Sequence, residues 1–199
     1  PKTGLLLASY WKDAWPEYPL IHCLLGTGEV GKSICHSNNI KGIFFTGSDQ
    51  TGHKIITNLP KHRPLTALEM GGNNALIVES YENLQKMSLD IVMSAFITSG
   101  QRCSNARRLI LVGKHDDLVE SLIKMTSSLI IDTFPSKKDP FMGPVVLKKV
   151  QQTLLQYKSK HPFLKSLLEP ESIGAGFCIR PGIFLDTNHQ ASDHELFGP

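Results

Sequence analysis

A cysteine in a polar segment is the residue of this sequence best suited to nucleophilic chemistry. Cys103 lies in "GQRCSNARR", with Arg102 beside it and two more arginines close behind. A thiol attacks as its thiolate, which partial exposure and neighbouring positive charge favour. Cys23 and Cys178 lie in apolar, strand-like runs and are expected to be buried. Cys103 is therefore the candidate nucleophile, although a single loop cysteine is by itself more often inert.

A carboxylate stands where it could serve as a general base. Glu69 ends the apolar run "LTALE" and is followed, after one methionine, by two glycines that would let the side chain move between positions. Such a carboxylate could take the proton of a thiol or of an attacking water. The other interpretation, a solvated charge at the end of a strand, stays open from these residues alone.

The glycine-rich stretch "GTGEVGKS", residues 26–33, fits two nucleotide-binding patterns. A phosphate loop would use Lys32 and Ser33, but the helical stretch after Lys32 is short, whereas that site needs a substantial helix. A dinucleotide fingerprint would need a downstream acid, and Asp49, about twenty residues on, lies inside another glycine turn. A tight turn that requires glycine is the favoured interpretation.

The second glycine turn, in "FFTGSDQTG", is the better ligand loop. A strand pattern runs directly into it and a helical pattern begins on its far side. The backbone amides of Gly47 and Ser48 could approach a pyrophosphate there. An ordinary strand-to-helix turn is the alternative.

Hydrophobic periodicity predicts the elements that must position these residues. Helices are expected at 4–15, 53–59, 81–99 (ending at Gly100), 116–131 and 145–158, and strands at 20–25 (buried), 42–46, on both sides of the double glycine, at 107–112 and within 177–187. Strands that alternate with helices predict an α/β fold with a parallel sheet of βαβ units. The pattern loosens near Gly71, which is the candidate domain boundary.

Composition narrows the class of protein further. The 199 residues are 41% hydrophobic and 20% charged, with a net charge of +3 spread along the chain, so we expect a globular protein that binds no nucleic acid. The four cysteines form no metal-ligand or disulfide pattern, which favours a reducing cytoplasm and no metal site. No apolar run reaches the ~18 residues of a membrane span. Both ends look cut, as in an internal fragment.

Four segments, "FTGSDQTG", "LEMGGNN", "FITSGQRCSNARRLI" and "HELFGP", together resemble the aldehyde dehydrogenase family in order and spacing. Within it, the resemblance is closest to the branch of succinylglutamate-semialdehyde dehydrogenases, bacterial enzymes of arginine breakdown. It implies an aldehyde-dehydrogenase-like α/β fold. Residues 1–69 would be the C-terminal part of a Rossmann-like NAD-binding domain, and residues 70–199 the N-terminal part of a catalytic domain.

The resemblance also implies roles for particular residues. Cys103 would add to the aldehyde as a thiohemiacetal, a hydride would pass to NAD, and Glu69 would activate the water that hydrolyses the remaining thioester. The residues implied along the cofactor are Gly47, Ser48, Asp49, Gln50, Thr51 and Gly52 at the pyrophosphate, Glu195 at the nicotinamide ribose and Phe197 near the nicotinamide ring. Lys32 and Ser33 would then have no phosphate to hold.

The family pattern has an upstream half, including an oxyanion-binding asparagine, without counterpart in this chain, so the isolated chain is expected to be inactive. Full-length members are expected to be homo-oligomers. Two rival functions remain from the sequence: a phosphate-loop nucleotide hydrolase using Lys32 and Ser33, and a non-catalytic remnant.

Overall fold

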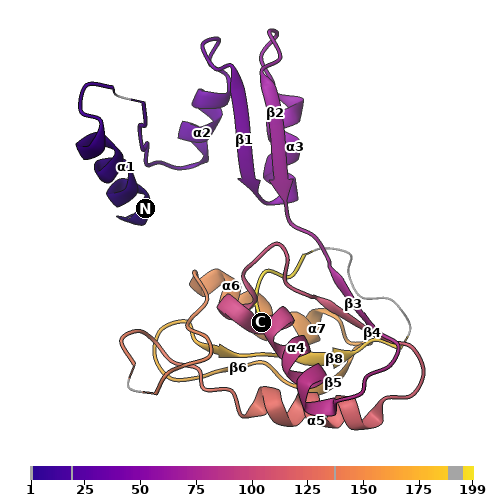
Figure 1. Cartoon of the computed structure of the whole chain (residues 1–199). Helices are drawn as coiled ribbons and strands as arrows, with labels where there is room; N and C mark the ends of the chain where they lie inside the picture. The colour runs from indigo at the N-terminus through magenta and orange to yellow at the C-terminus, as the bar shows by residue number, and fades with distance from the viewer. Residues whose placement is uncertain (1, 19, 137, 188–194) are drawn as a thin grey trace. The chain divides into compact units, whose positions relative to one another are not determined.

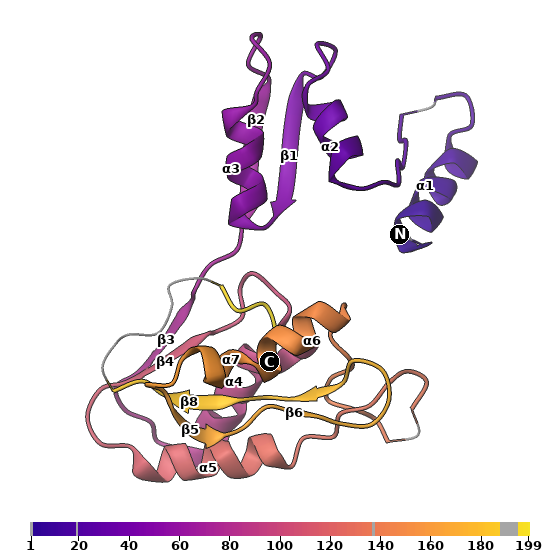
Figure 2. The same ribbon diagram turned by 180° about the vertical axis from the view of Figure 1, so that it is seen from behind.

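The computed structural model describes residues 2–18, 20–136, 138–187 and 195–199, in two compact units. The first unit is Pro1–Met70 and the second is Gly71–Pro199. Figures 1 and 2 show the chain from opposite sides. Each unit is described by itself below. None of the helices within the described ranges is long and apolar enough to cross a membrane.

A single βαβ unit organises the first part of the chain. Strand β1 (Gly42–Gly47) leads into helix α3 (Asp49–Thr57), and the chain returns as β2 (Leu65–Met70), parallel to β1. This parallel pairing and the parallel β3–β4 pair described below confirm the predicted α/β class. Gly52 is buried in α3, and a Cβ there would collide with the Met70 side chain. A residue without a side chain therefore lets the helix lie against β2.

Helix α3 begins earlier than the sequence predicted, at Asp49 instead of residue 53. The reason is Ser48, whose hydroxyl accepts a hydrogen bond from the Thr51 amide at 3.3 Å and so caps the helix. The second glycine turn is thus partly the first turn of a helix.

Two helices precede β1, namely α1 (Lys2–Ala14) and α2 (Gly28–Cys35). Helix α1 agrees with the predicted helix at 4–15, whereas α2 begins inside the predicted glycine turn, because the Thr27 side chain caps it at Gly28. The buried strand predicted at residues 20–25 was wrong: these residues form no strand, and all of them except Cys23 are exposed. An apolar run becomes a strand only where a neighbour satisfies its N–H and C=O groups. Within the described part of this unit, β1 and β2 pair only with each other.

The second unit opens with another parallel pair, β3 (Ala75–Val78) and β4 (Arg108–Leu111). Helices α4 (Leu84–Phe96) and α5 (Asp116–Ser127) pack on each other beside it. The buried core that they share consists of Val78, Ile91, Val92, Leu118 and Leu122. Tyr81 also donates a hydrogen bond to Asp117 at 2.6 Å, which raises the pKa of Tyr81 to about 12.

The rest of the second unit is made of short elements. Helices α6 (Lys148–Leu155) and α7 (Tyr157–Lys160) are followed by β5 (Lys165–Leu168), β6 (Glu171–Ser172), β7 (Ile179–Arg180) and β8 (Ile183–Leu185). Strand β5 pairs antiparallel with β8 (Figure 2), and β6 pairs antiparallel with β7. A second core contains Val145, Leu154 and Ile179.

The helix predicted over residues 81–99 is shorter in the structure. Asn83 caps α4 through a 2.8 Å bond from the Lys86 amide, so the helix begins after it. The C-terminal end is set by Ser94, whose carbonyl accepts from the Ala106 amide and the Asn105 side chain. The short turn η1 (Ile97–Gly100) follows, and two residues separate it from the candidate nucleophile.

Candidate active site

The backbone that leads to Cys103 adopts an unusual conformation. Thr98, Ser99 and Gly100 have φ angles of 56°, 57° and 62°. The left-handed region is unfavourable for a β-branched residue such as threonine, so this turn is strained. The Ser99 hydroxyl holds it by donating to the Gly143 carbonyl at 2.8 Å. Strain of this kind is frequent near functional sites.

A buried asparagine organises the segment 101–106, called the nucleophile turn here. Asn105 is only 2% exposed. Its Oδ1 accepts from the Arg102 amide at 2.8 Å, and its Nδ2 donates to the Ser94 carbonyl at 2.8 Å. The side chain therefore ties the nucleophile turn to the end of α4 and leaves Cys103 exposed.

A second asparagine, Asn74, joins the double-glycine segment to the same turn. Its Nδ2 donates to the carbonyls of Cys103, at 2.6 Å, and of Asn105, at 3.0 Å. The Asn74 carbonyl accepts from the amides of Arg107 and Arg108. The side-chain amides of Asn74, which precedes Cys103 in the sequence, and of Asn105, which follows it, thus both hold the backbone of the nucleophile turn. Sequence reasoning missed this duty of Asn74 and Asn105, and its only signal was their presence in the two strongest family segments.

The four cysteines differ in exposure in the way that nucleophilic chemistry requires. Cys103 is exposed, Cys23 and Cys35 are intermediate and Cys178 is buried, and all four are free thiols. Burial raises the pKa of Cys178, with a smaller contribution from the charge of Asp132. The thiolate of Cys178 is therefore disfavoured and inaccessible.

We expect Cys103 to be alkylated first when the chain is treated briefly with iodoacetamide near neutral pH. It combines exposure with an adjacent arginine, whereas Cys178 is buried and its pKa is raised by that burial. Mass mapping of the modified peptides measures the order of reaction. Faster modification of Cys35 or Cys178 in the folded chain contradicts the assignment of Cys103 as the nucleophile.

The predicted general base belongs to the first unit, and the predicted nucleophile to the second. Glu69 is exposed near the end of β2, opposite Thr46 of β1. It precedes Gly71 and Gly72, as the sequence indicated. The carboxylate is thus accessible to solvent, as a group that exchanges protons with water must be.

The residues predicted along the pyrophosphate also belong to the first unit. Gly47 ends β1, Ser48 caps α3, and residues 49–52 form the first turn of that helix. The first amides of a helix have no acceptor within the helix and carry its positive dipole end. This strand-to-helix junction has the chemistry that a pyrophosphate group needs.

The other glycine-rich stretch is not an open loop. Helix α2 begins at Gly28, capped by the Thr27 side chain, so Lys32 and Ser33 lie inside the helix. The Ser33 hydroxyl donates to the Glu29 carbonyl at 2.9 Å. A phosphate loop needs an open cradle of amides before its lysine, and here that segment is already helical. The structure therefore argues against the hydrolase alternative.

The two remaining predicted cofactor residues lie in the second unit. Glu195 is half-buried, and a Cβ on Gly71 would collide with its carboxylate, so a larger residue at position 71 would displace that side chain. The Oε1 atom of Glu195 is buried and accepts no hydrogen bond from the described residues. An unsatisfied buried acceptor is suited to a donor such as a ribose hydroxyl. Phe197 is 40% exposed and could cover an aromatic ring.

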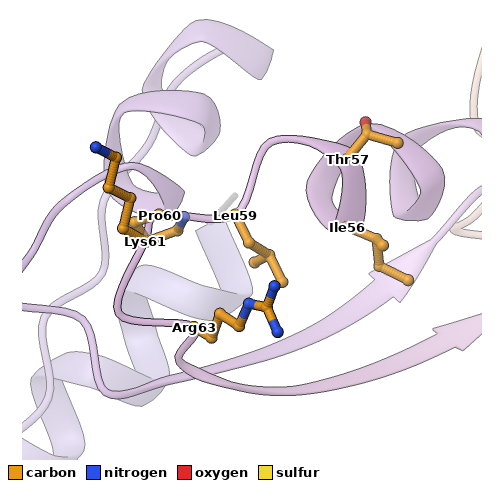
Figure 3. A pocket seen from close by; sticks show the side chains of 6 residues that line it. All are labelled: Ile56, Thr57, Leu59, Pro60, Lys61 and Arg63. Atoms are coloured by element: carbon orange, nitrogen blue, oxygen red, sulfur yellow. The ribbon is translucent and has the colours of Figure 1, made fainter.

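A hollow of about 590 Å³ lies outside this set of residues. It is formed where α3 ends and the chain turns toward β2, as Figure 3 shows. Its lining residues are Ile56, Thr57, Leu59, Pro60, Lys61 and Arg63. None of the predicted site residues lines it.

An exposed cysteine on a fixed turn, in an α/β chain that also has a strand-to-helix junction, is an arrangement that cofactor-dependent enzymes with covalent catalysis use. The sequence matches the description "Aldehyde dehydrogenase family" over residues 1–199. The chain belongs to the aldehyde dehydrogenase family.

Curated relatives and solved structures agree with this membership. The chain is 37% identical to an N-succinylglutamate 5-semialdehyde dehydrogenase of Vibrio cholerae and 33% identical to that of Acinetobacter baylyi. Each alignment covers all of this chain and 42% of the relative, so the chain spans less than half the length of these proteins. A 1-pyrroline-5-carboxylate dehydrogenase from Thermus, crystallised with bound NAD, is similar with a TM-score of 0.79 and 29% identity, over 91% of this chain and 37% of that one.

Proposed function

We propose that the protein to which this chain belongs oxidises an aldehyde to a carboxylic acid with NAD, and that Cys103 is its nucleophile. One observation carries the proposal: Cys103 is exposed on a turn whose backbone two asparagine side chains hold. A nucleophile must be both accessible and fixed in position to reach a near-attack geometry.

The steps follow from the chemistry of the two candidate catalytic residues. The Cys103 thiolate adds to the carbonyl carbon and forms a thiohemiacetal. Bound NAD would supply the acceptor for the hydride of that carbon, and Cys103 would then carry a thioester. Glu69 removes a proton from a water molecule, and the oxygen of that water attacks the thioester carbon. The carbon–sulfur bond then breaks, which releases the acid and returns Cys103 as its thiolate.

Several residues are proposed to hold NAD. The amides from Gly47 to Gly52 would receive the pyrophosphate, because they combine a strand end with a helix N-terminus. The unsatisfied Oε1 of Glu195 would accept from the nicotinamide ribose, and Phe197 would pack near the nicotinamide ring. Residues 1–69 would then be the C-terminal part of the NAD-binding domain, and residues 70–199 the N-terminal part of the catalytic domain.

The proposed substrate is N-succinylglutamate 5-semialdehyde, within arginine catabolism. Curated relatives at 31–37% identity carry this name. Arg102 offers physical support, because it precedes Cys103 in the nucleophile turn, is exposed and forms no hydrogen bond or ion pair through its side chain with the described residues. A cation beside the nucleophile favours an aldehyde that carries carboxylates. The proposed location is the cytoplasm, where cysteines such as these four remain free thiols. The proposed assembly is a homo-oligomer.

The test of this function needs a full-length protein that contains the chain. We expect N-succinylglutamate 5-semialdehyde to produce NADH, followed by absorbance, and an uncharged aldehyde of similar length to react less efficiently in kcat/KM. Equal kcat/KM for both aldehydes removes the role of Arg102 in substrate choice. Absence of NADH with either aldehyde refutes the dehydrogenase function itself.

The isolated 199-residue chain is expected to bind NAD weakly and to show no measurable turnover in the same assay. It holds only part of a dinucleotide site, and one oxyanion donor alone is typically worth about 3 kcal/mol in catalysis. Large apolar side chains such as Phe44, 79% exposed, and Leu65, 69% exposed, also stand uncovered in it. Sustained NADH production that disappears in Cys103→Ala would show this expectation to be wrong.

A further inference from the structure

Two segments far apart in the sequence meet at the start of the nucleophile turn. One is the left-handed turn that ends at Gly100, and the other is the C-terminal segment 195–199. A Cβ on Gly100 would lie 2.5 Å from the Gly198 carbonyl oxygen. Gly100 also has φ +62°, so both its conformation and its contact with Gly198 require glycine.

A single guanidinium bridges the two segments. Arg107 Nη1 donates to the Gly198 carbonyl at 3.3 Å, while Nη2 donates to the carbonyls of Gly100 and, at 3.3 Å, of Arg102. Three carbonyls from two segments therefore share one planar fork of donors. Lysine could not reproduce this arrangement, because its donors all lie on one atom.

Arg107 and Glu195, two oppositely charged residues, influence each other at the contact between the two segments. Burial lowers the pKa of Arg107, and the negative charge of Glu195 opposes that shift. Arginine nevertheless keeps its charge in proteins. Arg107 Nε and Glu195 Oε1 are both buried without hydrogen-bond partners among the described residues. The positive charge of Arg107 therefore interacts with the negative charge of Glu195, the carboxylate proposed to bind the ribose.

The neighbouring arginine is arranged differently. Arg108 is exposed and donates from Nε to the Asn73 carbonyl at 3.0 Å. It is not bonded to Gly198 or Gly100 in the hydrogen bonds of the described residues. Of this arginine pair, which the sequence presents as equivalent, Arg107 alone joins the nucleophile turn to the C-terminal segment.

We propose that Arg107 is a positioning residue that holds the turn bearing Cys103 and the segment bearing Glu195 and Phe197 as one body. In this way the thiol of Cys103 keeps a constant separation from the two proposed cofactor contacts of this unit, Glu195 and Phe197. The role of Arg107 in placing Cys103 for catalysis rests on the proposed function. The coupling of the two backbone segments does not depend on catalysis. Such coupling is reciprocal, so loosening either segment must loosen the other.

Amide hydrogen exchange of the 199-residue chain tests the coupling. In Arg107→Met, we expect the amides of Arg102 and Gly198, bonded at 2.8 and 2.9 Å in the wild type, to exchange roughly tenfold faster. The matched control is Arg180→Met, because Arg180 also donates to a backbone carbonyl, that of Ser127, at 2.7 Å. That control should leave both amides unchanged.

Three further variants separate coupling from general stability. Arg107→Lys keeps the charge and should restore protection in at most one of the two segments, since it has no fork. Gly100→Ala keeps Arg107 but wedges the segments apart, and should also speed exchange in both. Added methylguanidinium should restore protection to Arg107→Ala.

Three results would overturn the inference. One is faster exchange in only one segment of Arg107→Met. Another is an equal increase in the exchange rates of the amides of α5 in Arg107→Met. Leu118 and Leu122 of α5 lie in the buried core, so this result would give Arg107 a general structural role. The third is full protection of both segments in Arg107→Lys. Slow alkylation of Cys103 in the wild-type chain, together with faster exchange of both segments in Arg107→Met, would instead refute the proposed function and leave the coupling standing.

Discussion

Replacing Cys103 with alanine in a full-length protein that contains this chain is expected to abolish aldehyde oxidation. The thiolate forms the bond on which both later steps depend, so no partial route remains once it is removed. Loss of a covalent nucleophile typically costs at least roughly 10⁴-fold in kcat. Steady-state NADH formation with the succinylated semialdehyde measures the effect.

Binding of NAD should survive the same change, because the proposed cofactor contacts come from residues 47–52 and from Glu195 and Phe197. Titration of the Cys103→Ala protein with NAD, followed by calorimetry, should give a Kd within about threefold of the wild type. Cys35→Ala is a matched control that removes a more shielded thiol, and it should keep its activity. Substantial turnover in Cys103→Ala would remove this residue from the mechanism.

Glu69→Gln is expected to convert steady turnover into a burst. The first NADH should form at nearly the normal rate, and later turnovers should slow by roughly 10²- to 10⁴-fold, because the amide cannot take a proton from the attacking water. Stopped-flow absorbance on enzyme concentrations comparable to substrate separates the two phases. The acyl group should remain on Cys103, where intact-mass measurement detects it.

Glu79→Gln supplies the control for this experiment. Glu79 is also an exposed glutamate at the end of a strand, directly after β3, but the proposed mechanism gives it no role. Its variant should turn over like the wild type. A Glu69→Gln protein with unchanged steady-state rate would show that another group activates the water.

Local patterns in the sequence were sufficient for most elements of the fold. The alternation of "GIFFT", a helix and "LTALE" predicted the βαβ unit, because period and length distinguish a strand from a helix without reference to neighbours. The cap at Ser48 and the cap at Asn83 shifted the helix starts by a few residues, since a side-chain hydrogen bond decides where a helix begins. Composition around Cys103 likewise predicted a polar turn, and the residue is exposed.

The failure at residues 20–25 has a different origin. The apolar composition of "LIHCLL" is real, but a strand is a property of two segments, and the sequence of one segment does not specify its partner. In the described structure no other strand lies in register with it, and its side chains are exposed. Whether an apolar segment such as 20–25 pairs as a strand and is buried therefore depends on the tertiary structure.

By itself the sequence determined the α/β class, the order of the elements, the candidate nucleophile and the candidate base, because these depend on local periodicity and on side-chain chemistry. Only the tertiary structure decided what holds the nucleophile. The amide of Asn74 reaches the carbonyl of Cys103 across 29 residues, and Arg107 reaches Gly198 across 91. Backbone carbonyls are the same in every residue, so no pattern of side chains reveals which of them a distant donor will meet until the chain has folded.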